Sequence, residues 1–258
     1  MLAGMSAEPQ TSAPLDPAEL QAAVDRLRWF HTIDLGHGIV TPGQDETPQK
    51  LAQLHLPERM DGLSVLDVGA WDGFFSFECE RRGAARVVAV DPACWNPPVW
   101  GERGWGTKEP FELAHRALGS SVETLDVQLL DLSPETVGAF DIVLFLGVFY
   151  HLPDPWQYVE RVSSVCCGLL VVETHADLLD LRRPAMAFYP GSEIDGDPSN
   201  WWGPNPAALS GMLKHEGFSS VEVFKDGRAR RTVRSAYRRL KGDPFPAQAG
   251  RIVAHARR

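Results

Sequence analysis

One stretch decides the fold of this chain: Val65-Leu66-Asp67-Val68-Gly69-Ala70-Trp71-Asp72-Gly73. Here an apolar run ends in a glycine turn, and a second apolar run, residues 87–90, ends in Asp91. This order is typical of the first two strands of a nucleotide-binding α/β unit. Glycine suits a turn that lies against a ligand, because it has no Cβ and adopts positive φ readily. Asp91 suits a ribose, because a carboxylate accepts hydrogen bonds from both of its hydroxyls.

The turn departs from the dinucleotide-binding pattern at Trp71. That pattern is G-x-G-x-x-G, and Trp71 stands where its second glycine would let the backbone approach a pyrophosphate. The departure argues against a bound pyrophosphate, and therefore against a nicotinamide-dependent reductase.

Length and composition predict one α/β domain with appendages. The chain has 258 residues, of which 44% are hydrophobic and 23% charged, ordinary values for a globular protein. No apolar run approaches the roughly 20 residues that span a bilayer, and the N-terminus lacks the pattern of a secretion signal. The four cysteines have neither the number nor the spacing of a disulfide framework or a zinc site. We therefore expect a cytoplasmic monomer or homodimer with no metal and no membrane partner.

Charge is distributed unevenly. The net charge is −9, yet residues 225–258 carry eleven Lys and Arg against two Asp, a local charge of +9. The acidic total disfavours indiscriminate nucleic-acid binding. The basic segment, residues 225–241 above all, is either a solvated helix or a surface for an anionic partner, and the sequence leaves both open.

Three regions precede the glycine turn. Residues 1–16 have the composition of a disordered leader. In residues 17–60 we expect a helical and loop cap, whose first helix is opened by Asp16-Pro17 and runs as far as Phe30. A glycine-punctuated loop over residues 31–43 and a helix over residues 48–56 follow.

From residue 61 the chain alternates between strands and helices. Residues 140–147 form a continuously apolar run, as a central parallel strand does when both of its faces are buried. We expect further strands over residues 122–127 and 169–173, and helices over residues 110–118, 154–165 and 205–216. This alternation predicts a doubly wound, mostly parallel sheet whose loops gather at the carboxyl edge, where ligands bind.

These motifs together resemble the class I S-adenosylmethionine-dependent methyltransferases. The resemblance is carried by the glycine turn, Asp91, Asp131-Leu132 and Leu146-Gly147-Val148-Phe149-Tyr150-His151-Leu152. Residues 29–36, 147–151 and 200–202 are similar, more narrowly, to the tRNA wobble-uridine carboxymethyltransferase-like subfamily. Many of its members look like enzymes of secondary metabolism, antibiotic biosynthesis included. The likeness runs from about residue 27 to the C-terminus.

The resemblance implies a Rossmann-like sheet of seven strands, with S-adenosylmethionine as cofactor and S-adenosylhomocysteine as product. It places Asp67 near the amine of the methionine part, and Asp91, followed by Pro92, at the ribose. The cofactor contacts that it implies are Asp67, Gly69, Ala70, Trp71, Gly73, Asp91, Pro92, Asp131 and Leu132 at the adenine, Leu146 beneath the pocket, and Tyr150.

Wobble-uridine enzymes use a carboxylated form of the cofactor. By resemblance, Tyr150 and Arg251 match residues that help to hold it, and Lys50 matches a further lysine of the amino-terminal region. The carboxylate-reading lysine is missing, since its place falls near Phe30 and His31. Plain S-adenosylmethionine is therefore the expected cofactor.

Methyl transfer requires a nucleophile that loses its proton as it attacks. His151 and His175 follow two strands at the carboxyl edge and have ordinary pKa values near the working pH. Either is a candidate base, or a histidine that fixes local structure, and Glu173 could act as base or orient a neighbour.

The acceptor would lie between the cap and an insertion after the fifth strand. Residues 176–203 are rich in aromatic residues, Pro and Gly, and we expect them to form a lid. Within it Trp202 is the leading substrate contact, although it could instead pack the loop onto the core. His31, Lys50 and Arg251 complete the expected substrate site.

Three functions fit these features. The first is O-methylation of a small molecule such as a natural product or sugar. The second is tRNA wobble-uridine (carboxy)methyl transfer, which would need the basic segment to form a patch beside the pocket. The third is a non-catalytic nucleotide-binding module.

Overall fold

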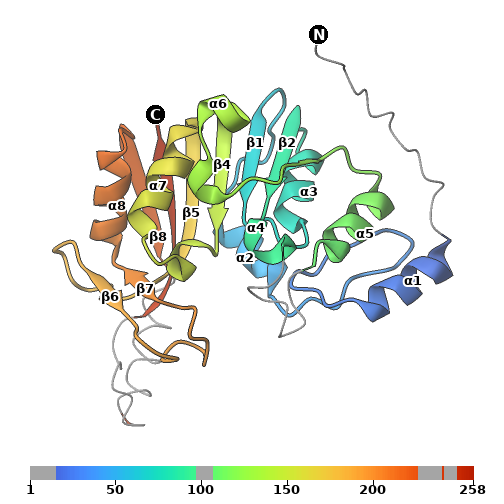
Figure 1. Ribbon diagram of the computed structural model, residues 1–258, viewed down its shortest axis with the longest axis horizontal. Helices are drawn as coiled ribbons and strands as arrows, with labels where there is room; N and C mark the ends of the chain where they lie inside the picture. The colour runs from blue at the N-terminus through green and yellow to red at the C-terminus, as the bar shows by residue number, and fades with distance from the viewer. Residues whose placement is uncertain (1–15, 97–106, 226–239, 241–248) are drawn as a thin grey trace.

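The structure, a computed structural model, describes residues 16–96, 107–225, 240 and 249–258. Its centre is a seven-stranded sheet of order β3-β2-β1-β4-β5-β9-β8 (Figure 1). Neighbours are parallel from β3 to β5, and β9 is antiparallel to both β5 and β8. The predicted doubly wound, mostly parallel sheet of seven strands is confirmed. The strands are β1 (Ser64–Val68), β2 (Arg86–Val90), β3 (Glu123–Thr124), β4 (Phe140–Leu146), β5 (Cys166–Ala176), β8 (Ser220–Lys225) and β9 (Gly250–Arg257).

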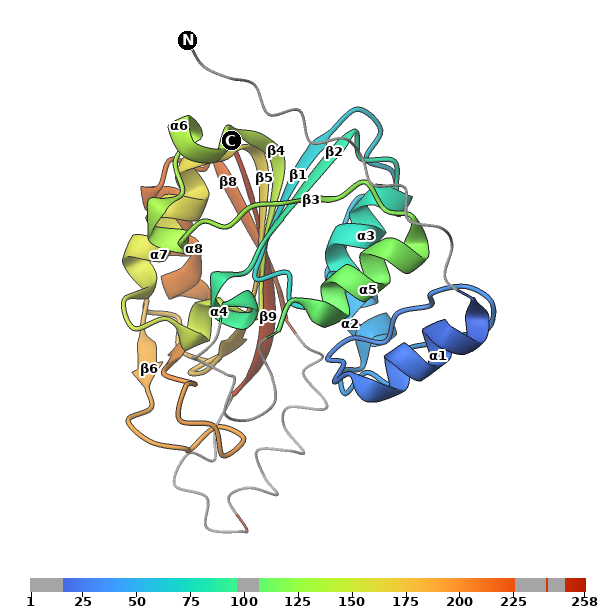
Figure 2. The ribbon, with the colours of Figure 1, turned by 45° about the vertical axis from the view of Figure 1, so that its right-hand side comes forward.

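Helices cover both faces of this sheet. Figure 2 shows α1, α2, α3 and α5 on one face and α6, α7 and α8 on the other. A hydrophobic cluster fills each interface between sheet and helices. The helices are α1 (Pro17–Arg26), α2 (Thr47–Gln53), α3 (Phe74–Arg81), α4 (Pro92–Trp95), α5 (Glu109–Leu118), α6 (Pro134–Val137), α7 (Pro155–Ser164) and α8 (Pro206–His215), with the short 3-10 turns η2 (Leu129–Asp131) and η3 (Phe149–His151). None of the helices described is long and apolar enough to cross a membrane.

The central strand shows why the apolar pattern was decisive. In β4, side chains on both faces are buried, and Phe140 and Phe145 are completely inaccessible to solvent. A strand covered by helices on both faces has no polar side, so its sequence is a continuous apolar run instead of an alternating one.

Several predicted elements were wrong in extent. The strand expected over residues 169–173 covers Cys166–Ala176, and the helix expected over residues 48–56 covers Thr47–Gln53. The first helix ends at Arg26 and not at Phe30, because the backbone N–H groups of Phe30 and His31 turn away to donate to Asp72 in the glycine turn. The third strand covers only Glu123–Thr124 and not residues 122–127, since this edge strand has a partner on one side only. The expected leader and most of the basic segment lie outside the described residues.

Residues 176–203 lie between β5 and α8. Their ends form a two-stranded antiparallel sheet of β6 (Met186–Phe188) and β7 (Trp202–Pro204), which lies at the lower end of the main sheet in Figure 1. The backbone N–H of Trp201 donates to the carbonyl of Tyr150 over 2.8 Å. This bond ties the insertion to η3, directly after β4.

Candidate active site

The glycine turn has the geometry that its sequence predicts. Gly69 and Gly73 have φ values of +84° and +90°, where an L side chain is strained. A Cβ on Gly69 would come within 2.4 Å of the Val148 side chain, so only glycine fits between β1 and the turn after β4. Trp71 shares the left-handed conformation, with φ +51°. The backbone from Gly69 to Gly73, including Ala70, is thus bent tightly at the carboxyl end of β1.

The Trp71 ring has a defined place. It stacks on Phe30 of the cap, with ring centroids 4.4 Å apart and an interplanar angle of 14°. Its carbonyl accepts a hydrogen bond from the indole N–H of Trp95 over 2.7 Å. Trp71, which stands in place of a second glycine, therefore connects the cap to the glycine turn.

Asp91 lies beside this turn with 3% of its surface exposed. One carboxylate oxygen accepts from the Trp71 N–H over 2.9 Å, and the other accepts from the Cys94 N–H over 2.8 Å as the N-cap of α4. Pro92 is the first residue of that helix. Each carboxylate oxygen keeps a second lone pair for a ribose hydroxyl. Burial raises the pKa of Asp91 above its ordinary value.

Asp67 is the second buried carboxylate of the turn region. It is 2% exposed and accepts a hydrogen bond from the Ser76 hydroxyl over 2.6 Å. Burial raises its pKa to about 6. A cation beside it, such as the ammonium group of the methionine part, would favour the charged carboxylate.

The remaining cofactor candidates differ in exposure. Leu132 is completely buried in the cluster beneath β1 and β2, whereas Asp131 is exposed. Leu146, at the end of β4, is 9% exposed and belongs to the cluster on the opposite face. Their contacts with the cofactor stay predictions.

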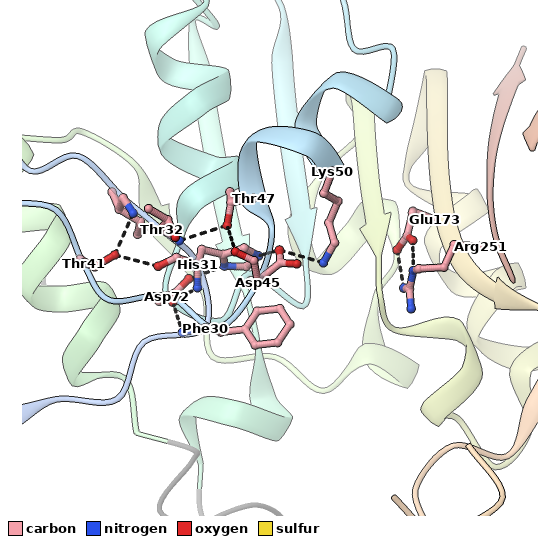
Figure 3. A network of polar contacts seen from close by, with 11 residues as sticks. Phe30, His31, Thr32, Thr41, Asp45, Thr47, Lys50, Asp72, Glu173 and Arg251 are labelled. Carbon is pink, nitrogen blue, oxygen red and sulfur yellow. Dashed lines mark hydrogen bonds and ion pairs between the residues drawn. The ribbon is translucent and has the colours of Figure 1, made fainter. Parts of the chain in front are cut away.

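Figure 3 shows a polar network that runs through the cap. The buried Asp72 accepts from the backbone N–H groups of Phe30 and His31, each over 2.8 Å, and its other oxygen lies 2.5 Å from Nδ1 of His31. On the far side of the imidazole, Asp45 lies 3.9 Å from Nε2 and pairs with Lys50 over 2.9 Å. His31 and Lys50 are therefore linked through Asp45, which lies close to both.

A second charged cluster lies across the site in the same view (Figure 3). Arg251 of β9 forms a two-pronged ion pair with the buried Glu173 of β5. Its guanidinium also lies 5.1 Å from the centre of the Tyr150 ring. Burial lowers the pKa of Arg251, but the charges of and hydrogen bonds to Glu173 and Tyr150 together outweigh this and raise it well above the ordinary value. Because Glu173 is engaged in this pair, it is less suited to act as a base.

The two candidate histidines both lie near the ring of Tyr150. The ring centroid of His151 is 4.2 Å from that of Tyr150, and the centroid of His175 is 6.3 Å from it. Nδ1 of His151 lies 3.1 Å from the carbonyl oxygen of Ser199 in the insertion, and burial lowers the pKa of this histidine. Nε2 of His175 lies 3.3 Å from the hydroxyl of Tyr189. The structure thus brings both histidines to one place.

The Trp202 side chain lies in an apolar groove. It packs against the hydrophobic cluster on the α7 and α8 face and lines an apolar groove with Trp156, Met186 and Met212. The role of Trp202 as a substrate contact stays a prediction.

Sequence reasoning missed four polar residues that hold this site: Asp72, Asp177, Tyr189 and Ser199. Asp72 lies between Trp71 and Gly73 in the glycine turn, and this position of a carboxylate was a signal that could have been used. The other three lie in the insertion, where no local pattern indicates which side chain meets which strand.

Comparison with known proteins agrees with this geometry. Residues 44–223, more than half of the chain, match the family described as a methyltransferase domain. A glycine turn on β1 of a seven-stranded sheet with antiparallel β9 defines the S-adenosylmethionine-dependent methyltransferases of class I. The chain belongs to this family.

Curated relatives are named tRNA U34 carboxymethyltransferase. The protein from Dichelobacter nodosus is 33% identical over 162 residues, which cover 62% of this chain and 46% of that protein. The protein from Cellvibrio japonicus is 29% identical over 197 residues, covering 76% of this chain and 56% of that protein. The chain spans about half the length of the curated relatives that it matches.

Among solved structures, the N-terminal domain of EvdMO1, solved in the presence of SAH and D-fucose, superposes with a TM-score of 0.66. The match covers 96% of this chain and 99% of that domain at 19% identity. At this identity the likeness shows the fold.

Proposed function

We propose that the chain transfers the methyl group of S-adenosylmethionine to a hydroxyl of a small molecule, a natural product or a sugar. The observation that carries this proposal is the pair of histidines, His151 and His175, beside Tyr150 at the carboxyl edge. A hydroxyl must lose its proton as it attacks the sulfonium methyl group, and a neutral imidazole is the side chain suited to accept it near neutral pH.

The environment of His151 is compatible with such a role. The Ser199 carbonyl oxygen only accepts, and the Ser199 hydroxyl, also 3.1 Å from Nδ1, donates its own proton to Asp197 over 2.8 Å. Nδ1 of His151 therefore carries the proton, and the lone pair of the neutral ring is on Nε2. The lowered pKa of His151 keeps the ring neutral at pH 7. With two neutral imidazoles near the acceptor, one can orient its hydroxyl and the other can accept the proton.

The cofactor would be held by the residues at the glycine turn. We assign the methionine part to the backbone of Gly69 to Gly73 and to Asp67, and the ribose to Asp91. The adenine would lie toward Asp131 and Leu132. When bound, the cofactor supplies an activated methyl group, so the protein contributes mainly positioning and removal of a proton.

A sugar-like acceptor receives support from the likeness to EvdMO1, whose N-terminal domain was solved with D-fucose and SAH. The net charge of −9 also favours a small neutral acceptor over a polyanion. We further propose that residues 176–203 act as the lid, that the protein is cytoplasmic, and that it belongs to secondary metabolism.

tRNA wobble-uridine modification is the second candidate. It is favoured by the names of the curated relatives. It is also favoured by Tyr150, Arg251 and Lys50, which by resemblance match residues that hold the carboxylated cofactor. Against it, by resemblance, Phe30 and His31 stand where the carboxylate-reading lysine is expected.

The test is a product analysis by mass spectrometry. The purified chain is incubated with S-adenosylmethionine and a panel of hydroxylated sugars and glycosylated natural products, and in parallel with unmodified tRNA and either form of the cofactor. We expect a methylated small molecule and stoichiometric S-adenosylhomocysteine, and no product with Asp91→Ala. Modified tRNA without any methylated small molecule would contradict the proposal, and cofactor binding without turnover on either substrate class would favour a non-catalytic module.

A further inference from the structure

A hydrogen-bonded chain of three polar side chains, the half-buried His175 and the buried Tyr189 and Asp177, lies at the candidate site. The Tyr189 hydroxyl is 2.5 Å from a carboxylate oxygen of Asp177, and Nε2 of His175 is 3.3 Å from the same hydroxyl. Asp177 is 5% exposed and Tyr189 only 2%. Burying a carboxylate and a phenol is costly unless each is hydrogen-bonded, so the arrangement needs an explanation.

The direction of each proton follows from chemistry. A carboxylate only accepts, and the other oxygen of Asp177 already accepts from the Leu178 N–H over 2.6 Å. The single hydroxyl proton of Tyr189 therefore points to Asp177. His175 must then donate its Nε2–H to the phenol oxygen. In the neutral ring this leaves the lone pair on Nδ1.

The backbone around this chain is shaped to hold it. Leu178, next to Asp177, has a φ of +53°, which a leucine rarely adopts. A Cβ on Gly203 of β7 would lie 3.0 Å from both Asp177 and the Tyr189 hydroxyl, so β7 approaches closely only because it has glycine there. The Tyr189 N–H donates to the carbonyl of Trp201 over 2.9 Å, which fixes the ring from the other side.

We propose that Tyr189 and Asp177 are positioning residues that hold His175 with its lone pair on Nδ1, so that His175 is the general base. This inference rests on the proposed O-methylation. The acceptor O–H bond breaks and its proton moves to Nδ1 of His175. The oxygen forms a bond to the methyl carbon while the C–S bond breaks, and its electron pair stays on sulfur. The imidazolium later releases the proton to water.

The two histidines differ in the stabilisation of that imidazolium. Both rings lie close to a hydroxyl that is bonded to a carboxylate. Nδ1 of His151 is 3.1 Å from both the carbonyl and the hydroxyl oxygen of Ser199, and that hydroxyl donates to the half-buried Asp197 over 2.8 Å. Behind His175 the hydroxyl of Tyr189 and the carboxylate of Asp177 are both buried, so water screens that negative charge less. Negative charge behind the ring favours the protonated form, as in a catalytic triad. This difference assigns proton transfer to His175 and hydroxyl orientation to His151.

The first test is independent of turnover. The ¹⁵N NMR spectrum of histidine-labelled protein reports which ring nitrogen carries the proton, and His175→Gln assigns the signals. We expect Nε2–H in the wild type. In Asp177→Asn the amide oxygen still accepts from Leu178, so its NH₂ faces Tyr189 and turns the hydroxyl proton toward His175. The proton of His175 then moves to Nδ1.

Tyr189→Phe is the matched variant, because it keeps the ring and removes only the hydroxyl. Here the two tautomers of His175 become mixed. His151, held by the Ser199 carbonyl, is the internal control and keeps Nδ1–H in every protein. An unchanged His175 tautomer in both variants, or Nδ1–H in the wild type, would overturn the inference.

The second test uses the acceptor found by the product analysis. We expect Asp177→Asn to lower kcat by about 100-fold or more, with KM for S-adenosylmethionine unchanged. In Tyr189→Phe the acidic limb of the kcat profile moves to lower pH, because the imidazolium of His175 loses its stabilising partner. A limb that does not move would show a merely structural role. The expected tautomers without any methylated product would refute the proposed function and leave the positioning of His175 intact.

Discussion

At the scale of single residues, two buried carboxylates beside the glycine turn are the groups expected to determine cofactor affinity. Asp67 and Asp91 are both nearly inaccessible, and burial raises both pKa values. Neither carboxylate has an ion-pair partner among the described side chains. A bound cation at Asp67 and two hydroxyls at Asp91 would compensate for this burial.

Because the pKa of Asp67 is about 6, the proposed contact predicts that cofactor binding depends on pH. Above pH 6 the carboxylate is charged, and in the proposed binding mode it would attract the ammonium group of S-adenosylmethionine. Each pH unit below that pKa reduces the charged fraction about tenfold, so affinity falls as the solution becomes more acidic. Calorimetric titrations from about one pH unit below the pKa of Asp67 to about two units above it would measure this change in affinity. In Asp67→Asn the slope should vanish, and an equal slope in that variant would assign the titration to another group.

Removal of Asp91 should weaken cofactor binding strongly. Asp91→Ala leaves two ribose hydroxyls without an acceptor, a loss of roughly 1.5 to 3 kcal/mol, which corresponds to tens of fold or more in affinity. Because Asp91 is also the N-cap of α4, thermal unfolding of the same variant measures how much stability is lost with that cap, apart from the loss of cofactor affinity. An unchanged calorimetric affinity would refute the ribose assignment.

At the scale of elements, the Asp72 side chain bonds the loop after α1 to the glycine turn. Asp72 accepts three hydrogen bonds from Phe30 and His31, and the Phe30 ring stacks on Trp71. The cap and the turn are therefore expected to become ordered together.

Asp72→Ala should destabilise the protein and loosen this contact. It leaves the buried His31 and two backbone N–H groups without their partner, at a cost of about 3 kcal/mol or more. Urea unfolding measures the loss, and calorimetry should show weaker cofactor binding. Asp61→Ala is the control, because Asp61 forms an exposed ion pair with Arg59 that contributes about 1 kcal/mol or less. Equal stability of both variants would contradict the role of Asp72.

Two glycines allow a matched test of the insertion. A Cβ on Gly203 would crowd Asp177 and Tyr189, whereas a Cβ on Gly211 of α8 would meet nothing within 4 Å. Gly203→Ala should cost about 1 to 3 kcal/mol and lower turnover. Gly211→Ala should raise stability by up to about 1 kcal/mol through helix propensity. Urea unfolding compares them, and a harmless Gly203→Ala would mean that β7 moves aside.

At the scale of the whole molecule, the sequence predicted those features that depend on local patterns. β4 and β5 were recognisable as continuous apolar runs, and the turn at Gly69 and Gly73 as a place where only glycine fits. The short β6 and β7 and the antiparallel β9 were missed, because their pairing is set by residues far away in the chain. The same reason hides the contact between His175 and Tyr189, which joins a strand to an irregular insertion.

Charge is the other property that belongs to the whole molecule. A chain of net charge −9 that acts on small molecules should bind tRNA weakly, and more weakly still as salt increases. A filter-binding assay at two salt concentrations checks this. Tight tRNA binding with a steep salt dependence would instead indicate that the basic residues after Lys225 form a patch beside the site.

The most direct test of the central claim is a competition between S-adenosylmethionine and its carboxylated form, measured by isothermal calorimetry on the wild-type chain. Methyl transfer to a small molecule predicts tighter binding of S-adenosylmethionine, because Phe30 and His31 replace the lysine that would read the extra carboxylate, and Glu173 already occupies Arg251. Preference for the carboxylated form would contradict the account and support wobble-uridine modification.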